Sequence, residues 1–123
     1  MKIEQTPLQD CLIIHDTVFK DDRGYFFESF NANRFKSLTG VSEHFVQDNQ
    51  SSSTRGVLRG LHMQTGEYAQ AKLVRVLEGS VLDIAVDMRK YSTTFGHTFS
   101  ISLLQKIINN YIFRVALHMA LLY

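Results

Sequence analysis

The run GVLRGLHMQ (56–64) holds two residues that could do chemistry, an arginine and a histidine three positions apart. Imidazole titrates near neutral pH, so His62 could act as a general base toward a weakly acidic C–H bond. Arg59 offers a planar fork of donors that suits a phosphate. On a regular strand the two side chains point to opposite faces, so they would share a site only if a bulge at Gly60 re-aims one of them.

The residues alone leave three interpretations of His62 open: a buried structural histidine, a metal ligand or a base. One common type of metal-binding β-barrel uses a His-x-His pair followed closely by Glu. Here the pair is replaced by His62-Met63-Gln64, and Glu67 alone does not complete such a site. We therefore expect no metal. We also expect no nicotinamide cofactor, because the chain has no Gly-x-Gly-x-x-Gly run to hold a dinucleotide.

Other charged residues lie within or beside strand-like runs. A dry core would exclude them, whereas a barrel interior that faces a ligand would need them. They are Arg23, Glu28, Lys72 and Arg75. For Lys72 and Arg75, each taken alone, an ordinary solvated side chain remains the alternative.

Composition limits the classes of protein to which the chain can belong. With 123 residues, 45% hydrophobic and 20% charged, residues 1–123 should form one domain. A net charge of +1 and the lack of a basic run argue against nucleic acid as a partner. No apolar run approaches the ~18 residues of a membrane span, and the first ten residues lack the apolar core of a signal peptide. A single cysteine fits a reducing, cytoplasmic setting.

The pattern of elements predicts a mainly β domain with one short helix near residues 32–39. Asn31 or Asn33 can cap that helix, and Gly40 can end it. Strands are expected over 11–19, 25–30, 44–51 and 56–64, and the turn residues 20–24 would make 11–30 a hairpin. A second hairpin is expected over 72–89, around Glu78-Gly79. Many short strands with close turns are typical of a sandwich or barrel.

Three long blocks carry a resemblance to a known family. They are FKDDRGYFFESFNANRF, FVQDNQSSSTRGVLRGLHMQ and AKLVRVLEGSVLDIAVDMRKYSTTFG. They resemble the dTDP-4-dehydrorhamnose 3,5-epimerases of dTDP-L-rhamnose synthesis, and the likeness runs from about residue 1 to 100. It implies a cupin-type jelly roll, incomplete at the C-terminus, and a homodimer in which strands cross between subunits. The implied reaction is cofactor-free and inverts two carbons beside the C4 ketone of a dTDP-4-keto-6-deoxyhexose.

The resemblance also implies roles for matched positions. His62 falls on the catalytic base and Lys72 on the cation near the keto oxygen. The remaining matched positions fall on the nucleotide and diphosphate site, with Phe26 and Glu28 reaching into the partner subunit's site. These substrate-binding positions are Arg23, Phe26, Glu28, Gln47, Asn49 and Arg59.

Residues 101–123 read unlike the rest. Residues 103–121 can be written in codons that, in a shifted frame, encode SAENNKQLYIPRGFAHGF, which is similar to the family sequence after TFG. We therefore expect a frameshift near residues 99–103 and a truncated epimerase, and sequencing the gene tests this expectation. The family's proton-returning tyrosine and histidine-orienting aspartate would then be missing, so activity would be impaired. This apolar tail should pair as a substitute strand or helix, and its spacing favours neither.

Two alternatives to an epimerase remain at this point. One is a non-catalytic module that binds a dTDP-sugar through Arg23, Arg59 and Asn49. The other is a related sugar-nucleotide ketoisomerase or single-carbon epimerase on the same scaffold, because substitutions in such sites redirect the outcome. Proton exchange and product stereochemistry distinguish the three.

Overall fold

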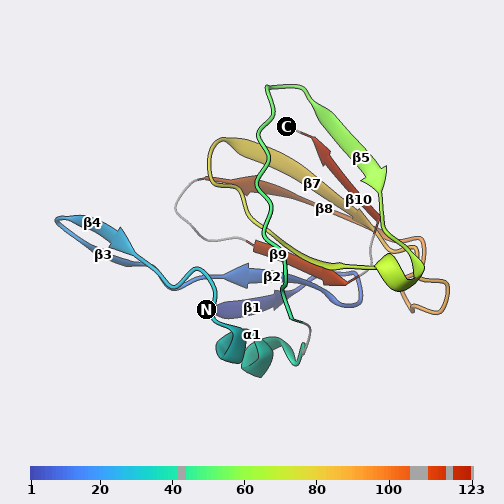
Figure 1. The fold of residues 1–123 in the computed structure, drawn as a ribbon, viewed down its shortest axis with the longest axis horizontal. Coiled ribbons are helices and arrows are strands. Elements are labelled where there is room, and N and C mark those ends of the chain that lie inside the picture. The colour runs from blue at the N-terminus through green and yellow to red at the C-terminus, as the bar shows by residue number, and fades with distance from the viewer. Residues whose placement is uncertain (42–43, 106–110, 116–117, 123) are drawn as a thin grey trace.

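The computed structural model describes residues 1–41 and 44–105, together with the backbone of residues 111–115 and 118–122. This described part is mainly β (Figure 1). Its strands are β1 (Lys2–Gln5), β2 (Cys11–His15), β3 (Phe19–Asp21), β4 (Gly24–Phe26), β5 (Leu58–His62), β6 (Ala71–Val74), β7 (Ser80–Val86), β8 (Thr98–Leu104), β9 (Tyr111–Val115) and β10 (His118–Leu122). Its helices are α1 (Ala32–Thr39) and the short 3-10 helix η1 (Gly66–Tyr68).

Two antiparallel sheets lie one above the other, and a hairpin projects to the side (Figure 1). Sheet I has the strand order β1-β2-β9-β6, and sheet II has the order β5-β10-β7-β8. The hairpin is β3-β4, with Asp21 paired to Gly24 across its turn. From β5 onward the chain passes repeatedly from one sheet to the other, so β5 and β6 become the edge strands of different sheets.

The core fills the space between the two sheets. Alternate residues of a strand point to opposite faces, so one side of β2 and one side of β7 enter this core. Its members are Leu8, Cys11, Ile13, Val74, Ala85, Phe99 and Ile101. The core therefore holds the inner faces of sheets I and II together.

The outer face of sheet I is also covered, by α1 and the segments beside it. Leu12 and Ile14 of β2 pack there against Phe35 of the helix. This explains why β2 is apolar along its whole length: it is buried on both faces. Among the described residues, no helix is long and apolar enough to cross a membrane.

The helix forms where the sequence predicted it. Asn31 is its N-cap, with the side-chain oxygen accepting from the Arg34 N–H at 3.0 Å. Gly40 ends it in the left-handed conformation, φ 73°, which glycine adopts without strain. Phe35 of the helix is buried, whereas Leu38, three positions further on, is 43% exposed.

The expected hairpin over 72–89 is wrong. Its two arms exist as β6 and β7, but they belong to different sheets and pair with other strands. Long-range pairing and burial of both arms against the core outweigh the local turn signal. A bend does lie between the arms, where Gly79 has φ 78°, a conformation that glycine adopts without strain.

The hairpin expected over 11–30 is also wrong in extent. The turn lies where it was expected, but only β3 and β4 pair across it, while β2 pairs with β1 and β9. No strand forms over 44–51, where the chain is extended but irregular. We call residues 44–57 the extended segment; it leads from the region of α1 to β5.

The tail, residues 101–123, completes β8 and contributes two further strands. The backbone of β9 pairs with β2 and β6, and the backbone of β10 pairs with β5 and β7. Of the two options left open for the tail, a strand is therefore confirmed over 111–115 and 118–122. The expectation for residues 106–110, 116–117 and 123 lies outside the described residues.

Candidate active site

A bulge in β5 decides the relation between Arg59 and His62. Position 119 of β10 pairs with His62, and position 120 pairs with Gly60, so one extra residue, Leu61, stands on the β5 side. Arg59 pairs with position 121. Positions 119 and 121 share a face, and so therefore do the arginine and the histidine. The condition set by the sequence, a bulge at Gly60, is met.

Cross-strand register shows which face this is. Positions 119 and 121 of β10 pair on their other side with Ala85 and Asp83 of β7. Directly paired residues of antiparallel strands point to the same face of the sheet. Since Ala85 belongs to the core between the sheets, Arg59 and His62 lie on the inner face of sheet II.

Lys72 lies on the inner face of the opposite sheet. In β6 the residues on either side of it, Ala71 and Leu73, pack on the outer cluster beneath α1. Val74 packs on the core between the sheets. Strand alternation places Lys72 on the same face as Val74, so it faces sheet II.

The two edge strands that carry His62 and Lys72 are joined at one end of the sandwich. His62 is the last residue of β5, and Lys72 is the second residue of β6. Figure 1 shows β5 running directly into η1, from which the chain continues into β6. All five residues of β5 are exposed, while those of β6 are half-buried, so this border of the inner faces is open to solvent.

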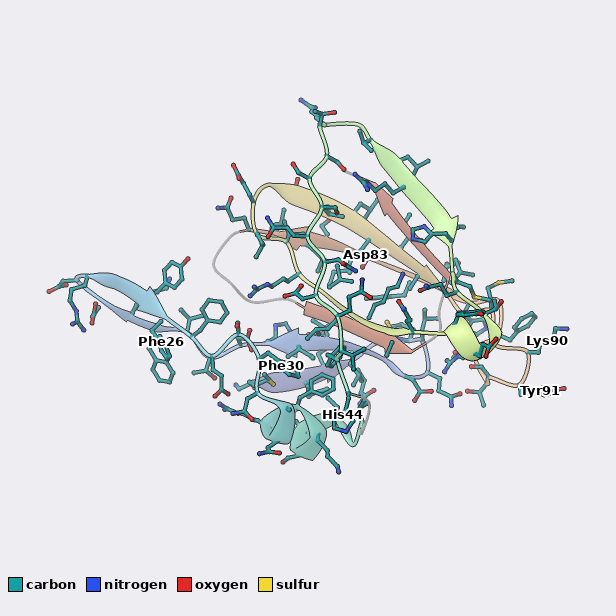
Figure 2. The ribbon with its side chains drawn as sticks, viewed as in Figure 1. Phe26, Phe30, His44, Asp83, Lys90 and Tyr91 are labelled. Atoms are coloured by element: carbon teal, nitrogen blue, oxygen red, sulfur yellow. The ribbon has the colours of Figure 1, made fainter. Side chains whose placement is uncertain are left out.

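Asp83 is a further candidate residue, which no sequence pattern assigned to the site. It is completely buried, and Figure 2 shows it between the two sheets. It shares the inner face of sheet II with Arg59 and His62, across from the sheet that carries Lys72. A buried carboxylate needs compensating polar partners. The signal available in the sequence was the alternation of aspartates with Val81 and Ala85 on one face of a strand.

Gln47 and Asn49 lie in the extended segment. Both are exposed, and the Gln47 amide donates to the Asn49 side-chain oxygen at 3.1 Å. Further along the segment, the Ser53 hydroxyl accepts from Nε of Arg59 at 3.0 Å. The segment with the predicted nucleotide-site residues is therefore fastened to the strand that carries Arg59 and His62.

Arg23 and Phe26 lie elsewhere. Both are on the β3-β4 hairpin, which extends away from the two sheets (Figures 1 and 2). The Asp21 carboxylate accepts from Nη2 of Arg23 at 2.6 Å, and the guanidinium lowers the pKa of this carboxyl below its usual value. Within one chain the structure does not bring these two residues to the others.

Glu28 follows the hairpin and is held at the start of α1. It accepts from the Asn31 side chain at 3.1 Å and lies 3.5 Å from a guanidinium nitrogen of Arg34. In the part of the chain that the structure describes, no three His, Cys, Asp or Glu side chains are grouped so as to hold a metal ion.

The family model for dTDP-4-dehydrorhamnose 3,5-epimerase matches residues 5–116. The epimerase of Escherichia coli (strain K12) is 53% identical over 96 residues, which cover 78% of this chain and 52% of the relative. The chain thus spans about half the length of the curated relatives it matches.

Solved structures agree with this match. The dTDP-4-dehydrorhamnose 3,5-epimerase of Elizabethkingia anophelis superposes with a TM-score of 0.93 at 49% identity, covering 99% of this chain and 67% of that one. The 3,5-epimerase of Legionella pneumophila, solved with dTDP-4-keto-L-rhamnose, has a TM-score of 0.90 at 39% identity, covering 98% and 64%.

Sequence and fold therefore lead to the same group of proteins. The two facing sheets are those of a cupin-type jelly roll, as the resemblance implied. The blocks that carry the resemblance contain the bulged strand, the extended segment and the projecting hairpin. The chain belongs to the dTDP-4-dehydrorhamnose 3,5-epimerase family.

Proposed function

We propose that this chain binds a dTDP-4-keto-6-deoxyhexose and moves protons at the carbons beside its C4 ketone, as an isomerase of dTDP-L-rhamnose synthesis. One observation carries the proposal. His62 and Arg59 lie on the inner face of one sheet, and Lys72 lies on the facing inner face of the other. A sugar that enters from the open border could meet a base, a diphosphate donor and a cation together.

The chemistry needs only these groups to begin. Neutral His62 takes a proton from the carbon next to the ketone, and the C–H electron pair moves into an enolate. Negative charge then grows on the keto oxygen, where the Lys72 ammonium would stabilise it. Donors of this kind are worth roughly 10²–10³ in rate, and a positioned base roughly 10²–10⁴. No metal or nicotinamide takes part in this step.

Inversion requires the proton to return on the opposite face of the sugar ring. The enolate carbon must therefore meet an acid on the side away from His62. Exchange of the proton with solvent and inversion of the carbon are separate events for this reason, and an experiment can measure each of them.

The nucleotide end would bind along the extended segment. Arg59 supplies paired donors for the diphosphate, a geometry that lysine cannot offer. Gln47 and Asn49, close before it, supply amide groups for the nucleotide. Binding to a nucleotide sugar also fits a cytoplasmic location, which we include in the proposal.

A second copy of the chain would complete the site. Arg23 and Phe26 are matched nucleotide-site positions, yet their hairpin extends away from the site of their own chain (Figure 2). We propose a homodimer in which this hairpin, followed by Glu28, reaches the site of the partner subunit. The 70% exposure of Phe26 supports this arrangement, since isolated two-stranded hairpins gain little stability by themselves.

The test uses dTDP-4-keto-6-deoxyglucose in deuterated water. The wild-type chain should incorporate deuterium at C3 and C5, and His62→Ala should lower the rate by roughly 10²–10⁴. The product is analysed by NMR for both deuterium content and configuration. His15→Ala is the matched control, because His15 lies in sheet I and its ring contacts Glu4 at 2.7 Å.

The outcomes separate the functions. Exchange with inversion at both carbons supports the epimerase, and inversion at one carbon points to a single-carbon epimerase. Exchange without inversion would mean that His62 acts as a base but that the chain does not epimerise the sugar. Binding without exchange identifies a non-catalytic module, and exchange that survives His62→Ala removes His62 from the mechanism.

A further inference from the structure

We propose that Ser53 is a positioning residue for Arg59, setting the direction in which its guanidinium meets the substrate diphosphate. The inference rests on the proposed function, since it assigns a role within the same nucleotide-sugar site. The role belongs to the Ser53 hydroxyl, which would act through Arg59.

The Arg59 guanidinium donates two hydrogen bonds to the extended segment. Its Nε donates to the Ser53 hydroxyl at 3.0 Å, and its Nη2 donates to the Ser52 backbone carbonyl at 3.2 Å. Two bonds from different nitrogens fix both the position and the plane of the group. A guanidinium has five N–H donors, so a phosphate can still be bound through others.

The order imposed on Arg59 matters because arginine is flexible. An exposed arginine samples many rotamers, and immobilising such a side chain when a ligand binds costs free energy. Bonds made before the ligand arrives remove part of that cost. Pre-orientation therefore raises affinity without any new contact between protein and ligand.

The location of Ser53 gives the contact a second effect. Ser53 lies in the extended segment with Gln47 and Asn49, whereas Arg59 lies in β5 beside the bulge. The bond from serine to arginine therefore joins the two parts of the nucleotide site. Losing it should weaken binding at the phosphate end.

The experiment measures dTDP affinity by isothermal titration calorimetry. Ser53→Ala should weaken binding about three- to tenfold, which is the size of one typical net hydrogen bond. Ser53→Thr keeps the hydroxyl and should stay within about twofold of wild type. Ser52→Ala is the matched control: it removes a neighbouring hydroxyl but keeps the carbonyl that Arg59 uses, so affinity should not change.

A double-mutant cycle separates positioning from a general structural effect. In an Arg59→Ala background, adding Ser53→Ala should cause no further loss, because there is no guanidinium left to orient. Equal losses in both backgrounds would overturn the proposal. So would wild-type affinity in Ser53→Ala. Failure of the wild-type chain to bind dTDP would instead overturn the proposed function, and the role of Ser53 with it.

Discussion

Asp87 is a buried carboxylate held by several hydrogen bonds. Its side chain is completely buried and accepts from Nε and Nη2 of Arg89, at 2.9 and 2.8 Å. Thr94 donates to it at 2.7 Å. Chiefly because of Arg89, the pKa of Asp87 lies well below its ordinary value of 3.8. The same arginine reaches Asp10 at 2.7 Å, so the group fastens the loop after β7 to the turn before β2.

This depressed pKa predicts acid sensitivity. The ionised Asp87 carboxylate contributes fully to the free energy of unfolding above about pH 4, the pKa of the unfolded state. This contribution is lost as the pH falls toward the lower pKa of the folded state. Asp87→Asn should lower stability at pH 7 by about 1–3 kcal/mol and make the acid decline shallower. Asp10→Asn removes a 53% exposed carboxylate from the same arginine and should cost less than about 1 kcal/mol.

Urea unfolding measured between pH 2 and pH 7 tests this prediction. The wild-type and Asp10→Asn curves should fall in parallel as the solution becomes acidic. If the free energy of unfolding of Asp87→Asn falls as steeply with acid as theirs, the Asp87 carboxylate is not the cause of the loss of stability at low pH.

At the scale of elements, local sequence patterns predicted the helix correctly, but they did not predict which strands pair with each other. The helix was predicted because its caps, Asn31 and Gly40, act within one turn of chain. The hairpin over 72–89 failed because the partners of β6 and β7 come from distant segments, which a local pattern does not contain. The spacing of Arg59 and His62 showed that a bulge was needed to place both side chains on one face. Whether the bulge exists was established only by the register between β5 and β10.

Some residues of the candidate site could be predicted from the sequence, and others could not. Long blocks of residues identified the family and the matched positions, including His62 and Lys72. Asp83 was not assigned, because a charged residue in an alternating strand does not reveal which face will be buried. The separation of Arg23 from Arg59 also depended on the direction of the hairpin, which local sequence does not determine.

The β3-β4 hairpin gives a prediction about assembly. Phe26→Ser should raise the dissociation constant of the proposed dimer by roughly tenfold or more, as loss of a buried interface aromatic does. The melting temperature at concentrations far below that constant should hardly change, because the side chain is 70% exposed in one chain. Tyr68→Ser, on η1 and 69% exposed, is the control.

Sedimentation velocity over a range of concentrations measures the effect. Association of the wild-type chain and the Tyr68 variant, with weaker association of the Phe26 variant, is the expected pattern. A wild-type chain that stays monomeric, or equal association of all three, contradicts a dimer built on this hairpin.

At the scale of the whole molecule, the sandwich presents on its two facing inner sides residues that neither sheet holds alone. Sheet II presents Arg59 and His62 on its inner face, and sheet I presents Lys72. The core between the sheets fixes their spacing, while the exposed edge strand β5 leaves a border open to a ligand. The central claim is that one sugar ring contacts both inner faces.

Nuclear Overhauser effects between bound substrate and protein test that claim most directly. With a dTDP-4-keto-6-deoxyhexose bound, the hydrogens of the sugar ring should show cross-peaks to the His62 ring and also to the Lys72 side chain. Both contacts require the ring to lie between the two sheets, close to each of them. A bound sugar with cross-peaks to only one of these residues, or to neither, would contradict the account.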